Sequence, residues 1–549
     1  MKTLSLSLFI TGFLFLSQLL NVQIIKAQNC DILIENSQLV VDGADINPGD
    51  RICIEGGTRS YLLFRNLQGT AAQPIEILNR GNIVIDTDHF YGLKMSNCRF
   101  IKMIGSQSNN QYGFTIRRVG NGAGISLDDM SSDIELAGFE ISYTALGGIY
   151  AKTDPDCSFE ATREKFTFYN LSIHDCYLHH IQDEGFYIGS SKFTGQYLPA
   201  CDTTVLPHLL QNVLIYDNIV ENTGWDGIQV SSSIGDCRIY NNKINFDSQR
   251  ETSNQMSGIL IGGGSNCDCY NNQIIDGKGD GIDVFGLGTT KIYNNLIVRA
   301  GRNYKPNDPT ESRHGIFIGN SPDQSISDNI LIHNTIISPK TTGIRYFNTN
   351  TAYNLIANNI ITDPGAYDIM GNKAYFDHQL ADVLYEEKTN IYTLNTGLLD
   401  FMDLQHDNYD LKATSFAVNT ATDFGYSSPQ FDNMMRPRPH NQGYDKGAFE
   451  SQDPYASIKE RQKTIKNKLQ LSPVPAKDFL LVKVANATEN MQLKLFDQLG
   501  VCVYRQENIS FLQLNEGYKI YLKEIFTGTY VIYLQGETTL ITDKIILQR

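Results

Sequence analysis

Two short phrases alternate along the middle of this chain, and one pair reads Cys269-Tyr270-Asn271-Asn272 and then Asp280-Gly281-Ile282-Asp283-Val284. The first phrase recurs in related form at residues 215–218, 239–242, 292–295 and 356–359. The second recurs at residues 226–230, 257–261, 314–318 and 342–346. The shortest spacing between copies is 23 residues, from Gly258 to Gly281. An internal repeat of this length is typical of a repeat architecture.

Each phrase alternates apolar and polar residues, which is the period of a strand with one buried face. Strands this short and this far apart cannot pair as hairpins with two-residue loops. Parallel stacking gives every strand a partner above and below, with the rest of each coil as the crossover. One asparagine of each first phrase is then expected to stack at a turn. These are Asn218, Asn242, Asn272 and Asn295. The sequence therefore predicts an all-β fold, a parallel β-solenoid.

Composition excludes two classes of protein. Hydrophobic residues make up 41% of the 549, which excludes disorder over most of the length. The formal net charge of −15 argues against nucleic-acid binding, which depends on Lys and Arg neutralising phosphates.

The first 27 residues read as an export signal. Lys2 precedes an apolar run over residues 4–20, and Ala27 supplies a small residue for cleavage. No later stretch approaches the length of a membrane span, so no span is expected in the mature chain. Export implies an oxidising compartment for the ten cysteines. Cys30 with Cys53, and Cys237 with Cys267, are interpreted as disulfides, although the sequence does not fix the connectivity.

The chain resembles right-handed parallel β-helix proteins of the pectate-lyase-like superfamily. The resemblance rests on an opening, Pro48-Gly49-Asp50-Arg51-Ile52-Cys53-Ile54, and an exit, Asp445-Lys446-Gly447-Ala448-Phe449-Glu450, around the repeats. It implies a right-handed β-helix over residues 28–450. Members of this superfamily differ widely in activity, so the fold alone does not name the reaction.

The C-terminal part of the chain differs from the repeats. Residues 451–470 are charged and aperiodic, as expected of a linker. Residues 471–549 begin with Leu471-Ser472-Pro473-Val474-Pro475 and resemble the sorting domain of type IX secretion in Bacteroidetes. That resemblance implies a small β-sandwich, recognition by the type IX machinery, and a cell-surface or secreted location reached through the periplasm and outer membrane. A carbohydrate-binding β-sandwich is the alternative interpretation.

Chemistry is expected where the outward-facing side chains of the second phrase form columns. Strands stacked about 4.8 Å apart would bring acidic, basic and imidazole groups of neighbouring copies together. The candidate catalytic residues are Asp280, Asp283, Arg313, His314 and Arg345. The candidate substrate-binding residues are Tyr187, Gln229 and Phe317. Asp226 and Asp280 are the candidate metal ligands, with calcium as the metal that carboxylate oxygens favour.

The sequence leaves three functional hypotheses open. The first is an enzyme acting on a polysaccharide, with β-elimination of an acidic polymer ahead of glycoside hydrolysis. The second is a non-catalytic protein that binds glycans or mediates adhesion. The third is a structural repeat protein, because an aspartate before a glycine is a common turn pair. A monomer is expected in each case.

Overall fold

The computed structural model describes the parts of the chain that carry the repeats and most of the C-terminal region. These are residues 30–106, 112–378, 383–440, 443–452, 469–485, 487, 490–497, 502–523, 525–535 and 540–548. The expected signal peptide, residues 1–27, and nearly all of the expected linker, residues 451–470, lie outside them. No helix within these ranges is long and apolar enough to cross a membrane.

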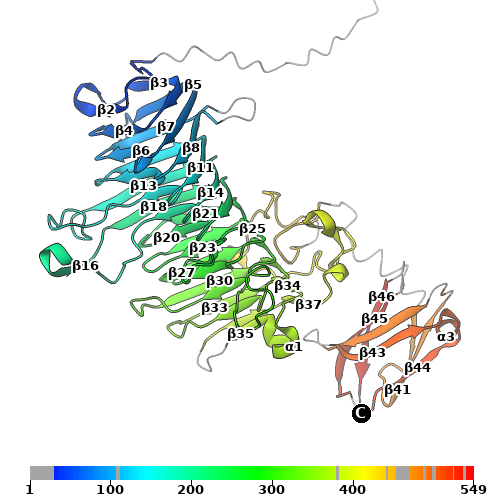
Figure 1. Cartoon of the computed structure of the whole chain (residues 1–549). Coiled ribbons are helices and arrows are strands. Elements are labelled where there is room, and N and C mark those ends of the chain that lie inside the picture. The colour runs from blue at the N-terminus through cyan, green and yellow to red at the C-terminus, as the bar shows by residue number, and fades with distance from the viewer. Residues whose placement is uncertain are drawn as a thin grey trace, which may run out of the picture.

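One face of the solenoid is a sheet of 12 parallel strands, called here the cleft sheet (Figure 1). In order along the solenoid its strands are β2 (Val40–Asp42), β4 (Leu62–Arg65), β6 (Tyr91–Ser96), β9 (Ala123–Asp128), β12 (Ile149–Ala151), β15 (Phe186–Ile188), β20 (Ile228–Val230), β23 (Ser257–Ile261), β26 (Asp280–Val284), β29 (Ile316–Ile318), β32 (Ile344–Tyr346) and β35 (Phe376–His378).

A second sheet of 23 strands forms the other two faces as two parallel ladders. The first ladder comprises β1 (Ile32–Ile34), β3 (Arg51–Arg59), β5 (Ile75–Thr87), β7 (Arg99–Ile104), β10 (Ser132–Ala137), β13 (Thr167–His174), β18 (Leu209–Tyr216), β21 (Cys237–Tyr240), β24 (Cys267–Tyr270), β27 (Gly288–Tyr293), β30 (Ser327–Ile332), β33 (Asn354–Ala357) and β36 (Glu386–Lys388). The second comprises β8 (Phe114–Val119), β11 (Phe139–Thr144), β14 (Tyr177–Ile181), β19 (Ile219–Thr223), β22 (Lys243–Asn245), β25 (Gln273–Ile275), β28 (Leu296–Val298), β31 (Thr335–Ile337), β34 (Ile360–Thr362) and β37 (Ile391–Thr393), and it joins the first through β5.

Each coil therefore contributes three strands, as in β24, β25 and β26, and the core lies inside the coil. Ile259, Ile282 and Ile316 are opposite one another in the register and fully buried, as the alternation predicts. The preceding glycine is required by close packing, because a Cβ on Gly281 would lie 2.4 Å from the carbonyl oxygen of Gly315. These observations confirm the predicted right-handed parallel β-helix.

The predicted asparagine stack is present as a buried hydrogen-bonded ladder. Asn272 Nδ2 donates to the carbonyl oxygen of Ile239 at 2.9 Å and to Asn295 Oδ1 at 3.0 Å. Its own Oδ1 accepts from the backbone nitrogen of Asn242 at 3.1 Å and from Asn242 Nδ2 at 3.0 Å. The ladder satisfies backbone groups that a turn would otherwise leave unpaired inside the protein.

Three disulfides lie in the described part of the chain. Cys30–Cys53 and Cys237–Cys267 confirm the two interpretations made from sequence. The third, Cys157–Cys201, ties the loop after β12 to the insertion that carries the hairpin β16 (Gln196–Leu198) and β17 (Thr203–Val205).

The regular coils end with β37. The helix α1 (Tyr367–Met370) lies between β34 and β35, and the hairpin of β38 (Phe401–Asp403) and β39 (Asn408–Leu411) follows β37. The C-terminal region has a three-stranded sheet of β40 (Leu469–Ser472), β41 (Phe479–Val484) and β44 (Tyr518–Tyr521), a four-stranded sheet of β42 (Met491–Phe496), β43 (Cys502–Ile509), β45 (Gly528–Gln535) and β46 (Leu540–Leu547), and the helix α3 (Phe511–Glu516). Residues from both sheets share one hydrophobic core, as expected of a small β-sandwich.

Candidate functional site

A cavity of about 530 Å³, called here the cleft, lies on the cleft sheet over strands β20 to β32. Its floor is formed by side chains that point outward from these strands. Its walls come from residues 253–256 and 312–313 before the strands, and from Ser191, Gly263 and Pro322 after them. A volume of this order is sufficient for a small ligand or a few units of a polymer.

The floor is a column of side chains in register. Gln229 lies opposite Leu260, Leu260 opposite Asp283, Asp283 opposite Phe317, and Phe317 opposite Arg345. Tyr187 precedes Gln229 in the same column, but it is not among the residues that line the cleft. Its hydroxyl lies 3.0 Å from Ser191 Oγ, which does line it.

A second column consists of the residue before each glycine, and hydrogen bonds join its members across rungs. Asp226 Oδ1 accepts from the backbone nitrogen and from Oγ of Ser257, both at 2.7 Å. Asp280 Oδ1 accepts from the backbone nitrogen of His314. The ring Nδ1 of His314 lies 2.6 Å from Thr342 Oγ1. These aspartates therefore do bond nearby backbone amides, which is the structural role that the turn interpretation expects.

Burial also changes the proton affinity of these carboxyls. Desolvation raises the pKa of Asp226 to about 8 and that of Asp280 to about 7. The pKa of Asp283 is raised well above its ordinary value, first by burial and then by Asp280 and Asp226 nearby. Asp283 Oδ1 is buried, and no described residue provides it with a hydrogen bond. The cleft thus holds carboxyl groups that keep protons near neutral pH.

Two arginines lie against these carboxyls. The Arg313 guanidinium stacks on Tyr304 at 4.4 Å and donates to the carbonyl oxygen of Ser312 at 2.8 Å. Arg345 stacks on Phe347 at 4.5 Å, and its Nε lies 3.7 Å from Asp377 Oδ2. The Nε atoms of both arginines are buried, and neither donates a hydrogen bond to a described residue. Both positive charges hold the pKa of Asp280 down against burial.

His314 is buried, and its ring is neutral. Burial lowers its pKa well below the ordinary value, and the charges of Arg345 and Arg313 act in the same direction. Sequence reasoning expected the imidazole to tune Asp280. In the structure the backbone nitrogen of His314 bonds that carboxyl, while the ring faces Thr342 and stacks against Phe317 at 5.9 Å.

The structure brings together nearly all of the site residues predicted from the sequence. The following line the cleft: Asp226, Gln229, Asp280, Asp283, Arg313, His314, Phe317 and Arg345. Wall residues 253–256 were not predicted, because they belong to a loop without a repeat. Among them, the Gln255 side chain places its amide nitrogen 3.2 Å from Glu184 Oε1 and 3.2 Å from Asp226 Oδ2. Asp377, beside Arg345, was also missed because its strand lacks the glycine phrase.

The suggested calcium ligands do not fit a metal site. Asp226 and Asp280 each commit one oxygen to backbone amides, and burial favours their protonated forms. Calcium takes six to eight oxygen ligands, and carboxyl oxygens bind it in their ionised form. Within the described ranges, no three His, Cys, Asp or Glu side chains are grouped to hold a metal ion.

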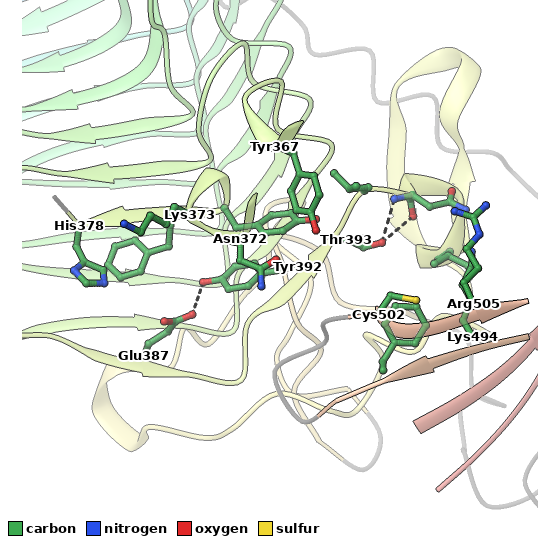
Figure 2. Close-up of a pocket in the computed structure, with 16 residues that line it drawn as sticks. Tyr367, Asn372, Lys373, His378, Glu387, Tyr392, Thr393, Lys494, Cys502 and Arg505 are labelled. Carbon is green, nitrogen blue, oxygen red and sulfur yellow. Dashed lines mark hydrogen bonds between the residues drawn. The ribbon is translucent and has the colours of Figure 1, made fainter. Parts of the chain in front are cut away.

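Figure 2 shows another cavity, of about 520 Å³, called here the terminal cavity. Tyr392 and Glu387 from the end of the solenoid line it together with Lys494, Cys502 and Arg505 from the C-terminal region. Glu387 is the one carboxylate among its described lining residues, and it accepts a hydrogen bond from the Tyr392 hydroxyl at 2.7 Å. The cleft, with its convergent acids, is therefore the stronger candidate site.

Two family models match the chain. Residues 209–379 match the right handed beta helix region, and residues 470–548 match the secretion system C-terminal sorting domain. No curated protein matches the chain.

Several solved structures are similar in fold. An alginate lyase from Paenibacillus sp. str. FPU-7 is 14% identical with a TM-score of 0.37, over 58% of this chain and 99% of that one. A GH136 lacto-N-biosidase from Eubacterium ramulus is 16% identical with a TM-score of 0.43, over 64% of this chain and 63% of that one. Pectate lyase Pel9A is 16% identical with a TM-score of 0.34, over 74% of this chain and 89% of that one. Likeness at this level concerns the fold and not the reaction. The chain is a right-handed parallel β-helix protein that carries a type IX secretion C-terminal sorting domain.

Proposed function

We propose that this protein is an exported glycoside hydrolase that cleaves a polysaccharide in the cleft. The observation that carries the proposal is the pair Asp280 and Asp283, two carboxyls that line one cavity and whose pKa values are both raised by burial. Hydrolysis of a glycosidic bond needs one carboxyl to give a proton and another to act as base or nucleophile.

Asp283 has the properties of the general acid. It projects from the centre of the floor, and burial together with the neighbouring carboxyls raises its pKa, which favours the protonated form. Its buried Oδ1 has no hydrogen-bond partner among the described residues. The carboxyl can therefore form a further hydrogen bond with a glycosidic oxygen that enters the cleft. The proton passes from Asp283 to the oxygen of the leaving sugar as the bond to the anomeric carbon breaks.

Asp280 has the properties of the base or nucleophile. Burial raises its pKa to about 7, while Arg313, the backbone amide of His314 and Arg345 act in the opposite direction and stabilise its ionised form. No hydrogen bond from a described residue reaches Oδ1 of Asp283 to do the same there. As base it would take a proton from the attacking water, and as nucleophile it would bond the anomeric carbon.

The remaining groups would position the sugar. Gln229 and Phe317 flank the acids in the floor column and offer an amide and an aromatic face. The neutral His314 ring is held by Thr342 and stacks against Phe317, so it fixes the orientation of that face.

Elimination from an acidic polymer is the second candidate, favoured by one observation. The Arg345 side chain lines the cleft, its buried Nε has no hydrogen-bond partner among the described residues, and its ion pair with Asp377 spans 3.7 Å. A guanidinium in that position would neutralise the carboxylate of a uronate and so acidify the adjacent C–H group. Three carboxyls crowd the same cavity, which is why hydrolysis is preferred.

The decisive experiment incubates the full exported protein with neutral and acidic polysaccharides. Hydrolysis releases reducing ends without new ultraviolet absorbance, whereas elimination also creates an absorbing unsaturated uronate. Asp283→Asn and Asp280→Asn should each abolish product formation and preserve glycan binding. Asp217→Asn, the same exchange at an exposed turn of the solenoid, is the matched control. Glycan binding by the wild type without any product would favour the non-catalytic alternative and overturn the proposal.

Export is the remaining part of the proposal. The sorting-domain match at residues 470–548 supports passage through the type IX machinery to the cell surface or medium. The apolar stretch within residues 1–27 supports prior entry into the periplasm. Deleting residues 471–549 should leave the protein in the periplasm, and its unchanged appearance in the medium would contradict this route.

A further inference from the structure

A third cavity, of about 410 Å³, called here the distal cavity, lies on the same cleft sheet nearer the N-terminus. Its floor consists of Ser126 on β9 and Tyr150 on β12, both pointing outward. Its wall is the loop of residues 152–161, which Cys157–Cys201 ties to the insertion after β15. No motif in the sequence pointed to it.

The distal cavity and the cleft share one column of side chains. From the distal cavity the register runs Ser126, Tyr150, Tyr187, Gln229, Leu260 and Asp283. Five strand spacings of about 4.8 Å place Ser126 about 24 Å from Asp283 along the solenoid axis. The two cavities are therefore successive hollows on one straight face.

Tyr187 lies between the two hollows. Its ring packs edge-on to Tyr150 with centroids 5.5 Å apart, and Lys152 Nζ lies 4.9 Å from its ring centroid. Beneath this stretch, Glu184 is 2% exposed, and its Oε2 has no hydrogen-bond partner among the described residues. The Tyr187 ring thus occupies the junction between the two hollows, where a bound chain would pass, whereas Glu184 lines neither cavity.

The distal cavity is lined by hydrogen-bond acceptors. Its carboxylates are Asp128, Asp129, Asp154, Asp156 and Glu160. Lysines offset part of this charge: Lys94 bonds Asp128 and Asp129, each at 3.0 Å, Lys152 bonds Asp154 at 2.9 Å, and Lys165 bonds Glu160 at 2.7 Å. Five carboxylates against three ammonium groups leave the cavity negative.

This lining favours uncharged hydroxylated ligands. Sugar hydroxyls donate well to carboxylates, and such charge-assisted hydrogen bonds are stronger than neutral ones. A uronate or sulfate group would instead be repelled by the excess negative charge.

We propose that the distal cavity is a remote subsite that binds an uncharged segment of the same glycan chain whose bond is cleaved in the cleft. The proposal rests on the proposed function for the identity of the ligand as a glycan. It adds that the substrate is a chain long enough to reach both hollows, and that this remote segment is uncharged. Binding energy gained at the distal cavity would hold the chain in register over Asp283.

The test measures binding as a function of chain length. Isothermal calorimetry would use the full-length Asp283→Asn protein, so that no turnover occurs. The probes are disaccharide-to-hexasaccharide series of β-glucan, xylan and N-acetylglucosamine, with a galacturonate series as the charged comparison. We expect one neutral hexasaccharide to bind at least about tenfold more tightly than its disaccharide, as one or two added hydrogen-bonded sugars would give.

Ser126→Trp fills the floor of the distal cavity, and Thr115→Trp is its matched control. Thr115 also points outward from a strand of the solenoid, but it lies on β8 in a different face. Ser126→Trp should reduce hexasaccharide affinity to that of the disaccharide, while Thr115→Trp should change neither. Melting temperatures of both variants report whether the solenoid has kept its fold.

Each outcome separates this inference from the proposed function. Equal affinity for short and long neutral chains, a larger length effect for galacturonate, or no binding by any series would overturn the distal subsite. Hydrolysis by the wild type without a length effect would leave the proposed function standing alone. A length effect that Ser126→Trp removes, in a wild type that forms no product, would support the distal subsite and refute the hydrolase.

Discussion

Replacing Asp226 by asparagine is expected to stabilise the protein at neutral pH and to leave its stability unchanged in acid. The Asp226 carboxyl is fully buried, and burial raises its pKa from 3.8 to about 8. Between these pH values the unfolded chain releases the proton while the folded chain keeps it. The stability of the wild type therefore falls as the pH rises through this window.

The expected magnitude follows from the same shift. Each pKa unit corresponds to about 1.4 kcal/mol, so at pH 7 the wild type carries a penalty of about 4 kcal/mol that asparagine does not. The two hydrogen bonds with Ser257 are preserved, because the amide oxygen can accept from the Ser257 nitrogen and hydroxyl as Asp226 Oδ1 does at 2.7 Å. The Gln255 amide, whose nitrogen lies 3.2 Å from Asp226 Oδ2, must turn its oxygen toward the new NH2 group. The amide nitrogen takes the place of the carboxyl O–H as a donor.

Urea unfolding of the full chain at several pH values from 4 to 8 measures the effect. The difference between Asp226→Asn and wild type should be near zero at pH 4 and largest near pH 8. Asp247→Asn gives a graded comparison, since burial raises the pKa of Asp247 to about 6 and predicts about 3 kcal/mol at pH 7. A stability difference that does not vary with pH, or a loss of stability at every pH, would refute the reasoning.

Three further predictions concern the pH profile, the ladder and the cleft wall. Activity should fall as the pH drops below about 7, because Asp280 must be ionised to act and its pKa is about 7; a flat kcat/KM profile between pH 5 and 8 would contradict its role. Asn272→Ala should lower the free energy of unfolding by about 3 kcal/mol or more, since it leaves Ile239 and Asn242 backbone groups unpaired, and denaturant titration measures this. Cys157→Ser should lower the free energy of unfolding by about 2–4 kcal/mol under oxidising conditions. With reductant present, the variant and the wild type should unfold with the same free energy.

The sequence by itself determined the architecture, because each central coil of the fold corresponds to a short repeat that is visible in the sequence. Alternating apolar residues and a glycine before an inward isoleucine recur in the central coils, so parallel stacking is the one arrangement that pairs all of these strands. The same regularity is sufficient to predict that Asp280, Asp283 and Arg345 belong to outward-facing columns. The asparagine ladder followed from it as well. The two disulfide interpretations came from the cysteine positions, whose connectivity the sequence left open and the structure decided.

The tertiary structure decided what the repeats cannot encode. The loop that carries Gln255 and the insertion that carries Ser191 have no periodicity, and only their packing against the sheet makes the face of Asp283 a cavity. That packing removes water from the carboxyls, and desolvation raises their pKa values. Sequence order likewise gave no sign that Ser126 and Asp283, more than 150 residues apart, lie on one straight face. Five strand pairings, which join the six strands from β9 to β26, set that geometry.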